Sequence, residues 1–263
     1  MAASRSQRQQ SEAEVVLPTG LRAERELVAD ACRVLAARDL APGFLGHVSL
    51  RAGPGLMLIR CRGPHERGLA WTKAADIRLV TFDGEPGADG ELGDWEPPNE
   101  LPLHAEVLRA RPGVVSVVHA HPESTVAADL AGLAIRPIVG AYDIPGAKLA
   151  AGGVPVYPRA VLLRTTELAR EMVTALGDRP VVLLRGHGLT STGGSVQEAV
   201  LRAVSVDAIA RMSLAVRMAG GELRDLPAGD LAGLPDLGPA FNEGVAWRHE
   251  LARLGGVADW EPG

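Results

Sequence analysis

Short apolar runs rich in β-branched residues alternate along this chain with amphipathic segments of helical period. The strand-like runs lie at residues 41–53, 55–63, 76–85, 113–122 and 180–194, the last of which runs into a glycine-rich turn. The helix-like segments lie at 21–40, 101–112, 123–132, 165–178 and 195–221. Apolar spacing of two favours strands, and spacing of three and four favours helices. Because such elements bury their apolar faces against one another, the alternation predicts one α/β domain with helices layered on a sheet.

The remaining segments have weaker patterns. Residues 1–18 are polar and poor in aromatics, which predicts a flexible N-terminal tail before a single domain over 19–263. Residues 135–146 and 154–159 are typical of strand and loop, and the chain after about residue 225 is typical of a loop followed by one final helix over 241–254.

Composition excludes several classes of function. The net charge of −5 provides no electrostatic basis for binding nucleic acid or a membrane surface, and no apolar run is long enough to span a bilayer. The expected partner is a small-molecule substrate. Cys32 and Cys61 are not spaced as a redox or zinc pair, which fits a reducing, cytoplasmic setting. Lysine occurs only at Lys73 and Lys148, outside any conspicuous motif, so Schiff-base chemistry has few candidates.

Two histidines end the strand-like run "VVSVVHAHP". Side chains at i and i+2 of a strand point to one face, so His119 and His121 project side by side. A third histidine, His187, stands between two glycines after "PVVLLR". Three neutral imidazoles form a ligand set for a catalytic divalent ion, with zinc first and iron, manganese or cobalt also compatible. The alternative is half-buried histidines that hydrogen-bond to backbone.

Longer motifs surround these histidines. "NELPLHAEVLRARPGVVSVVHAHPEST", followed by "LLRGHGLTSTGGSVQEA", resembles the class II aldolase and adducin family, as does "GHVSLR" at residues 46–51. The resemblance spans roughly residues 21–220. It implies a three-layer α/β/α fold with a mixed, largely antiparallel central sheet. It also implies a homotetramer with sites between subunits.

The resemblance assigns roles to individual residues. His119, His121 and His187 match the metal ligands, and Glu100 matches the catalytic acid/base, whose pKa we expect burial to raise. Tyr142 lies near the place of a tyrosine acid that a neighbouring subunit supplies. The alternatives are a first-turn carboxylate that stabilises a helix dipole for Glu100 and a packed tyrosine for Tyr142.

Three positions depart from the family pattern and bear on the substrate. Asn99 stands within "PNE" where the aldolases have hydroxyl residues, His47 replaces a turn asparagine, and Arg62 enters the phosphate loop. We expect all three to contact substrate. With the hydroxyl-rich phosphate cradle largely lost, a carboxylate fits Arg62 better than a sugar phosphate. The alternative for Arg62 is a solvated charge at a strand end.

These observations predict a divalent-metal-dependent lyase that cleaves or decarboxylates a carbon–carbon bond of an oxygenated carboxylate. A metal-bound enolate is common to both reactions. A second possibility is a non-haem iron oxygenase acting on an α-keto or α-hydroxy acid in aromatic metabolism, although three histidines without a carboxylate are not the usual iron triad. A third is a non-catalytic, adducin-like module.

Overall fold

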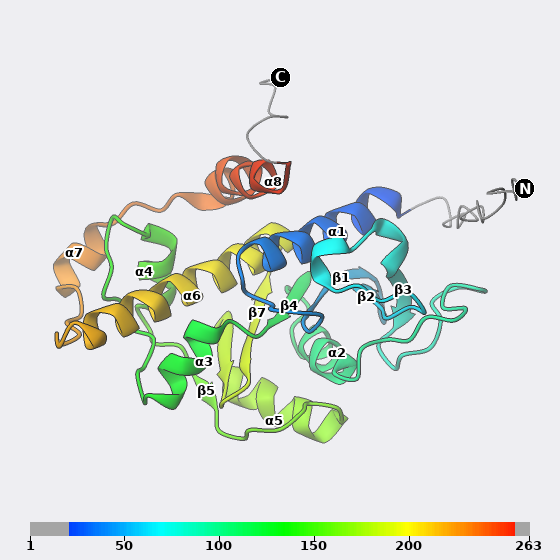
Figure 1. Cartoon of the computed structure of the whole chain (residues 1–263), viewed down its shortest axis with the longest axis horizontal. Helices are drawn as coiled ribbons and strands as arrows, with labels where there is room; N and C mark the ends of the chain where they lie inside the picture. The colour runs from blue at the N-terminus through cyan, green and yellow to red at the C-terminus, as the bar shows by residue number, and fades with distance from the viewer. Residues whose placement is uncertain (1–20, 256–263) are drawn as a thin grey trace, which may run out of the picture.

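The computed structural model describes residues 21–255 (Figure 1). The predicted flexible tail over residues 1–18 lies outside this range, and the single domain over 19–263 stays a prediction. No helix within the described residues is long and apolar enough to cross a membrane.

One seven-stranded sheet forms the centre of the described structure. Its order is β3-β2-β1-β4-β7-β6-β5, and every neighbouring pair is antiparallel except β5 and β6. The strands are β1 (His47–Gly53), β2 (Leu56–Arg60), β3 (Ile77–Thr81), β4 (Ser116–Ala120), β5 (Val156–Tyr157), β6 (Val181–Leu184) and β7 (Gly188–Gly193). Apolar side chains alternate between its two faces, so each face needs a covering layer.

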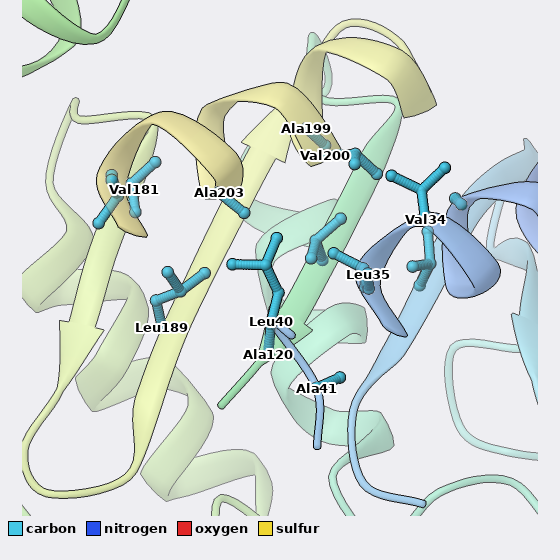
Figure 2. Close-up of a cluster of buried hydrophobic side chains, with 14 of the residues drawn as sticks. Val34, Leu35, Leu40, Ala41, Ala120, Val181, Leu189, Ala199, Val200 and Ala203 are labelled. Carbon is cyan, nitrogen blue, oxygen red and sulfur yellow. The ribbon is translucent and has the colours of Figure 1, made fainter. Parts of the chain in front are cut away.

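Helices cover both faces (Figure 1). On one face α1 (Arg22–Ala37) and the long helix α6 (Val196–Met218) bury the larger core, which includes Leu35 of α1, Val200 of α6 and Leu189 of β7 (Figure 2). On the other face α2 (Leu101–Ala110) and α5 (Thr166–Leu176) pack on each other and bury a second core. The expected three-layer α/β/α fold with a mixed sheet is therefore confirmed.

Local sequence patterns predicted the starts of several elements correctly. Ser195 caps α6 by accepting a hydrogen bond from the Glu198 N–H, and Thr165 caps α5 through the Leu168 N–H. The first two strand-like runs correspond to β1 and β2, which pair as an antiparallel hairpin. The structure also contains α3 (Glu123–Leu130) where the pattern predicted it.

The segment between α3 and α5 differs from the prediction. We expected strand and loop over residues 135–146, but α4 (Ile144–Ala150) begins there. Asp143 caps this helix by accepting from the Gly146 N–H, and Pro145 suits its first turn. Two further elements escaped prediction: β7, which follows β6 as a hairpin, and the short helix α7 (Ala228–Gly233). The final helix is π-helical over Ala240–Ala246 and continues as α8 (Trp247–Gly255).

Candidate metal centre

The strand registers bring the predicted ligands to one end of the sheet. His47 of β1 is paired with His119 of β4, and β4 then runs on to His121. The β6–β7 hairpin turns at the same end, because Leu184 pairs with Gly188 and the turn between them carries His187. Glu100 occupies the N-cap position of α2, although its side chain makes no capping hydrogen bond. Side chains from four separate segments of the chain therefore converge.

The convergence is close enough for one ion. The ligand atoms of Glu100, His119, His121 and His187 all lie within 4.8 Å of one another. His119 Nε2 is 2.7 Å from His121 Nε2 and 3.1 Å from Glu100 Oε2, and His187 Nε2 is 3.8 Å from the same carboxylate oxygen. Three imidazole nitrogens and one carboxylate oxygen form a donor set that suits zinc and related divalent ions.

The protonation of His119 supports a cation at this point. Its Nδ1–H donates to the Leu189 carbonyl oxygen at 3.0 Å, so a neutral ring has only a lone pair on Nε2. That lone pair faces the Glu100 carboxylate, which also has only lone pairs to offer when ionised. A positive charge between them removes this repulsion. A hydrogen bond from Nδ1 to a backbone carbonyl oxygen is also a usual way in which proteins orient a histidine that binds metal through Nε2.

Burial keeps the other histidines neutral. It lowers the pKa of His121 to about 3, with added repulsion from His119 and His187, and it also lowers the pKa of His187. Neutral imidazoles are the form that binds metal.

Glu100 differs from the expectation. Burial acts to raise its pKa, but the hydrogen bond and charge that His119 offers when its Nε2 is protonated, together with the Leu163 N–H, outweigh burial and lower it to about 2. The predicted raised pKa is therefore wrong, because the carboxylate is surrounded by donors: at neutral pH Glu100 is an ionised carboxylate.

Contacts with Asp129 hold the turn that carries His187 in place. Asp129, at the end of α3, accepts from the Gly186 N–H at 2.9 Å and forms an ion pair with Arg185 at 3.1 Å. Gly186 has a φ of +58°, in the region that favours glycine. A Cβ atom at Gly188 would lie 2.2 Å from the Ala120 carbonyl oxygen, so β7 can approach β4 this closely only with glycine there.

Replacing Gly188 with alanine should therefore both destabilise the fold and displace His187. We expect a loss of about 1–3 kcal/mol in the free energy of unfolding, as for overpacking in a close-packed interior, with weaker metal binding. Urea unfolding and metal analysis measure the two effects. Gly113→Ala is the matched control, since a Cβ atom there meets nothing within 4 Å. Equal stability of the two variants would contradict the argument.

The other residues predicted to bind substrate or to act as an acid lie outside the four-residue cluster. Arg62 follows β2 at the same end of the sheet, and its guanidinium lies over the Phe44 ring at 5.9 Å from the ring centre. No ion pair involves Arg62 among residues 21–255. Asn99 is exposed and next to Glu100 in the chain. Tyr142 is 76 % exposed and is not part of the four-residue cluster.

His104 is a buried neighbour of the cluster and is not among the predicted site residues. It lies on α2 one turn after Glu100, and its Nε2 is 2.8 Å from His47 Nδ1. His47 in turn lies beside His119, with 5.1 Å between ring centres. Five histidines therefore gather at one end of the sheet. The i, i+4 spacing of Glu100 and His104 was the available signal, since it places both on one side of a helix.

Comparisons with known proteins agree with this geometry. The family model "Class II Aldolase and Adducin N-terminal domain" matches residues 26–214. The chain is 74 % identical to 3,4-dihydroxyphthalate decarboxylase of Terrabacter sp. (strain DBF63) over 90 % of this chain and 99 % of that protein. It is 67 % identical to the protein of that name from Arthrobacter keyseri, over 88 % of this chain and 93 % of that protein.

The fold has solved counterparts. An aldolase II superfamily protein from Pseudomonas syringae superposes with a TM-score of 0.73 at 22 % identity, over 91 % of this chain and 96 % of that one. The relatives confirm the predicted enzyme class, a carbon–carbon lyase of the decarboxylase type, in preference to an oxygenase or an adducin-like module. The chain belongs to the class II aldolase and adducin family.

Proposed function

We propose that this protein decarboxylates 3,4-dihydroxyphthalate, releasing CO₂ and a dihydroxybenzoate. The observation that carries the proposal is the cluster of Glu100, His119, His121 and His187, in a chain 74 % identical to an enzyme of that name. The substrate offers two adjacent hydroxyls and two adjacent carboxylates. A site with a divalent ion and a nearby arginine suits such oxygens.

The cofactor is a divalent metal ion, as the family and the cluster indicate, and we propose zinc. Glu100, His119, His121 and His187 would hold it. A bound ion would act as a Lewis acid, binding neighbouring oxygens of the substrate and stabilising negative charge that develops on them.

Within this arrangement Glu100 moves the proton, since it is the only carboxylate in the cluster. It takes the proton of a phenolic hydroxyl and delivers it to the ring carbon that carries the departing carboxylate. The bond between that carbon and the carboxylate carbon breaks, its electron pair restores the aromatic ring, and CO₂ leaves. Water then returns a proton to the phenolate oxygen.

Arg62 would hold a carboxylate of the substrate. It is at the same end of the sheet as the cluster, and its partner in the described structure is the Phe44 ring rather than an acid. Asn99 and His47 complete the proposed contacts to substrate. The exposed aromatic face of Phe44 adds an apolar surface on which an aromatic ring can pack.

The role of Tyr142 requires a second copy of the chain. With 76 % of its surface exposed, the side chain is available to a neighbouring subunit rather than to its own cluster. We therefore propose a homotetramer in which Tyr142 serves the site of the adjacent copy as an acid. The two buried free cysteines support the proposed cytoplasmic location.

Substrate specificity tests the proposed function. Metal-loaded protein should release one CO₂ per molecule of 3,4-dihydroxyphthalate, and neither phthalate, which lacks hydroxyls, nor a ketose phosphate should react. Protein stripped of metal should be inactive until a divalent ion is restored. Cleavage of the sugar phosphate without decarboxylation of the aromatic acid would contradict the proposal.

Arg62→Ala should weaken binding of carboxylates specifically. Loss of a charge-assisted contact, about 1.5–3 kcal/mol, should raise KM for 3,4-dihydroxyphthalate by ~10- to 150-fold. Inhibition constants separate the causes, because phthalate should lose affinity while neutral catechol should not. Arg67→Ala is the control, an exposed arginine in the same loop. An equal loss for phthalate and catechol would make Arg62 a structural residue.

A further inference from the structure

A row of three polar side chains lies beside the metal-ligand cluster. Ser49 Oγ is 2.7 Å from His104 Nδ1, and His104 Nε2 is 2.8 Å from His47 Nδ1. Ser49 and His104 are completely buried, and His47 is 5 % exposed. Ser49 and His47 share one face of β1, two residues apart, and α2 brings His104 onto that face. Each ring nitrogen in the row therefore faces a defined partner except His47 Nε2.

The 2.8 Å between His104 Nε2 and His47 Nδ1 leaves room for one proton, so one of these nitrogens donates and the other accepts. His104 is a neutral ring, because burial lowers its pKa to about 3. It has one N–H and one lone pair, and the proton on one of its nitrogens determines the role of the other. The two hydrogen bonds of the row can consequently both point toward His47 or both point toward Ser49.

The serine hydroxyl selects between these directions. Its only hydrogen-bond partner among the described residues is His104. If His104 Nδ1–H donated to Ser49, the buried hydroxyl proton would have no acceptor, which is strongly disfavoured. Ser49 therefore donates to His104 Nδ1, and His104 donates its Nε2–H to His47 Nδ1. The proton of His47 is then on Nε2.

We propose that Ser49 and His104 are positioning residues that hold His47 as an Nε2–H donor, and that His47 gives this hydrogen bond to an anionic oxygen of the substrate. His47 is placed for it, because it pairs with His119 across β1 and β4 with ring centres 5.1 Å apart. The His47 side chain makes its hydrogen bond through Nδ1, and its Nε2 makes none to residues 21–255. A neutral donor stabilises a carboxylate or phenolate oxygen without adding a charge beside the metal.

This inference rests on the proposed function only for the chemical class of the substrate oxygen. The direction of the hydrogen bonds from Ser49 to His47 does not depend on that function. Amide side chains imitate the two ring nitrogens separately: a glutamine amide reaches the position of Nε2, and an asparagine amide reaches only that of Nδ1.

Paired variants test the proposal through binding. In zinc-loaded protein, His47→Asn and Ser49→Ala should weaken the binding of phthalate, measured by calorimetry, by about 10- to 100-fold and by a few fold, respectively. His47→Gln and Ser49→Thr, which keep the donors, should retain most of the affinity. Zinc content should stay unchanged in all four, and each variant should keep the circular dichroism spectrum of the wild type. Equal losses in His47→Gln and His47→Asn, or losses that follow zinc content, would overturn the proposal.

Neutron diffraction from deuterium-exchanged wild-type crystals gives a second measurement that needs no variant to fold. Deuterium on Nε2 of both His47 and His104 is the expected result, and deuterium on Nδ1 of either ring would overturn the proposed direction. The outcome does not depend on turnover. Failure of the wild-type protein to decarboxylate 3,4-dihydroxyphthalate would instead count against the proposed function alone.

Discussion

Replacing His119 with alanine is expected to remove the bound metal ion and abolish decarboxylation. His119 lies at the centre of the cluster, within 3.1 Å of both His121 and Glu100. Because its loss takes away a ligand itself, the fall in metal affinity should exceed the ~10–100-fold that changes to outer partners of a ligand cost. Metal analysis of the purified variant and its turnover of 3,4-dihydroxyphthalate measure the effect.

His119 is completely buried, so a second variant separates metal loss from misfolding. His121 is partly exposed, and His121→Ala should lose metal while keeping the circular dichroism spectrum of the wild type. His249→Ala is the matched control, an exposed histidine on α8. Full metal occupancy in a folded His121→Ala protein would remove this residue from the ligand set.

Replacing Glu100 with glutamine should lower turnover by roughly 10²-fold or more, because the amide cannot move a proton. The amide oxygen can still accept the Leu163 N–H, which keeps the start of α2 in place. Much of the metal should remain on the three histidines. Single-turnover rates and metal content, measured on the same sample, distinguish the two contributions.

A carboxylate at the start of a helix also stabilises the helix dipole, so a control is needed. Glu167 is an exposed first-turn carboxylate of α5. Glu167→Gln should cost at most about 0.3–1 kcal/mol of stability and leave turnover unchanged. If Glu100→Gln behaved in the same way, its role would be that of a helix-capping charge.

The fold and the three histidines could be predicted because their signals are local. The alternation of strand and helix patterns predicts the layers, and the spacing of His119 and His121 predicts a shared face. The sequence patterns did not predict short elements whose first residue is set by a capping side chain, as Asp143 sets the start of α4. The turn at His187 looked like the end of a strand, since β7 after it consists largely of glycine, serine and threonine.

The pKa of Glu100 and the role of His104 depend on packing that no spacing reveals. Burial of Glu100 was predictable, but the donors that surround it come from His119, His187 and the loop at Leu163, all distant in sequence. The row from Ser49 to His47 likewise joins α2 to β1 across more than fifty residues. Tyr142 illustrates a further limit, since its proposed role involves another copy of the chain.

The most direct test of the account is the stoichiometry of decarboxylation without oxygen. Zinc-loaded protein should convert 3,4-dihydroxyphthalate in an anaerobic chamber, with one CO₂ released per substrate and no change in rate when air is readmitted, because a Lewis acid needs no oxidant. In D₂O, the product should contain one deuterium at the carbon that lost its carboxylate. Turnover seen only with iron and air, with one oxygen consumed per substrate, would contradict the account.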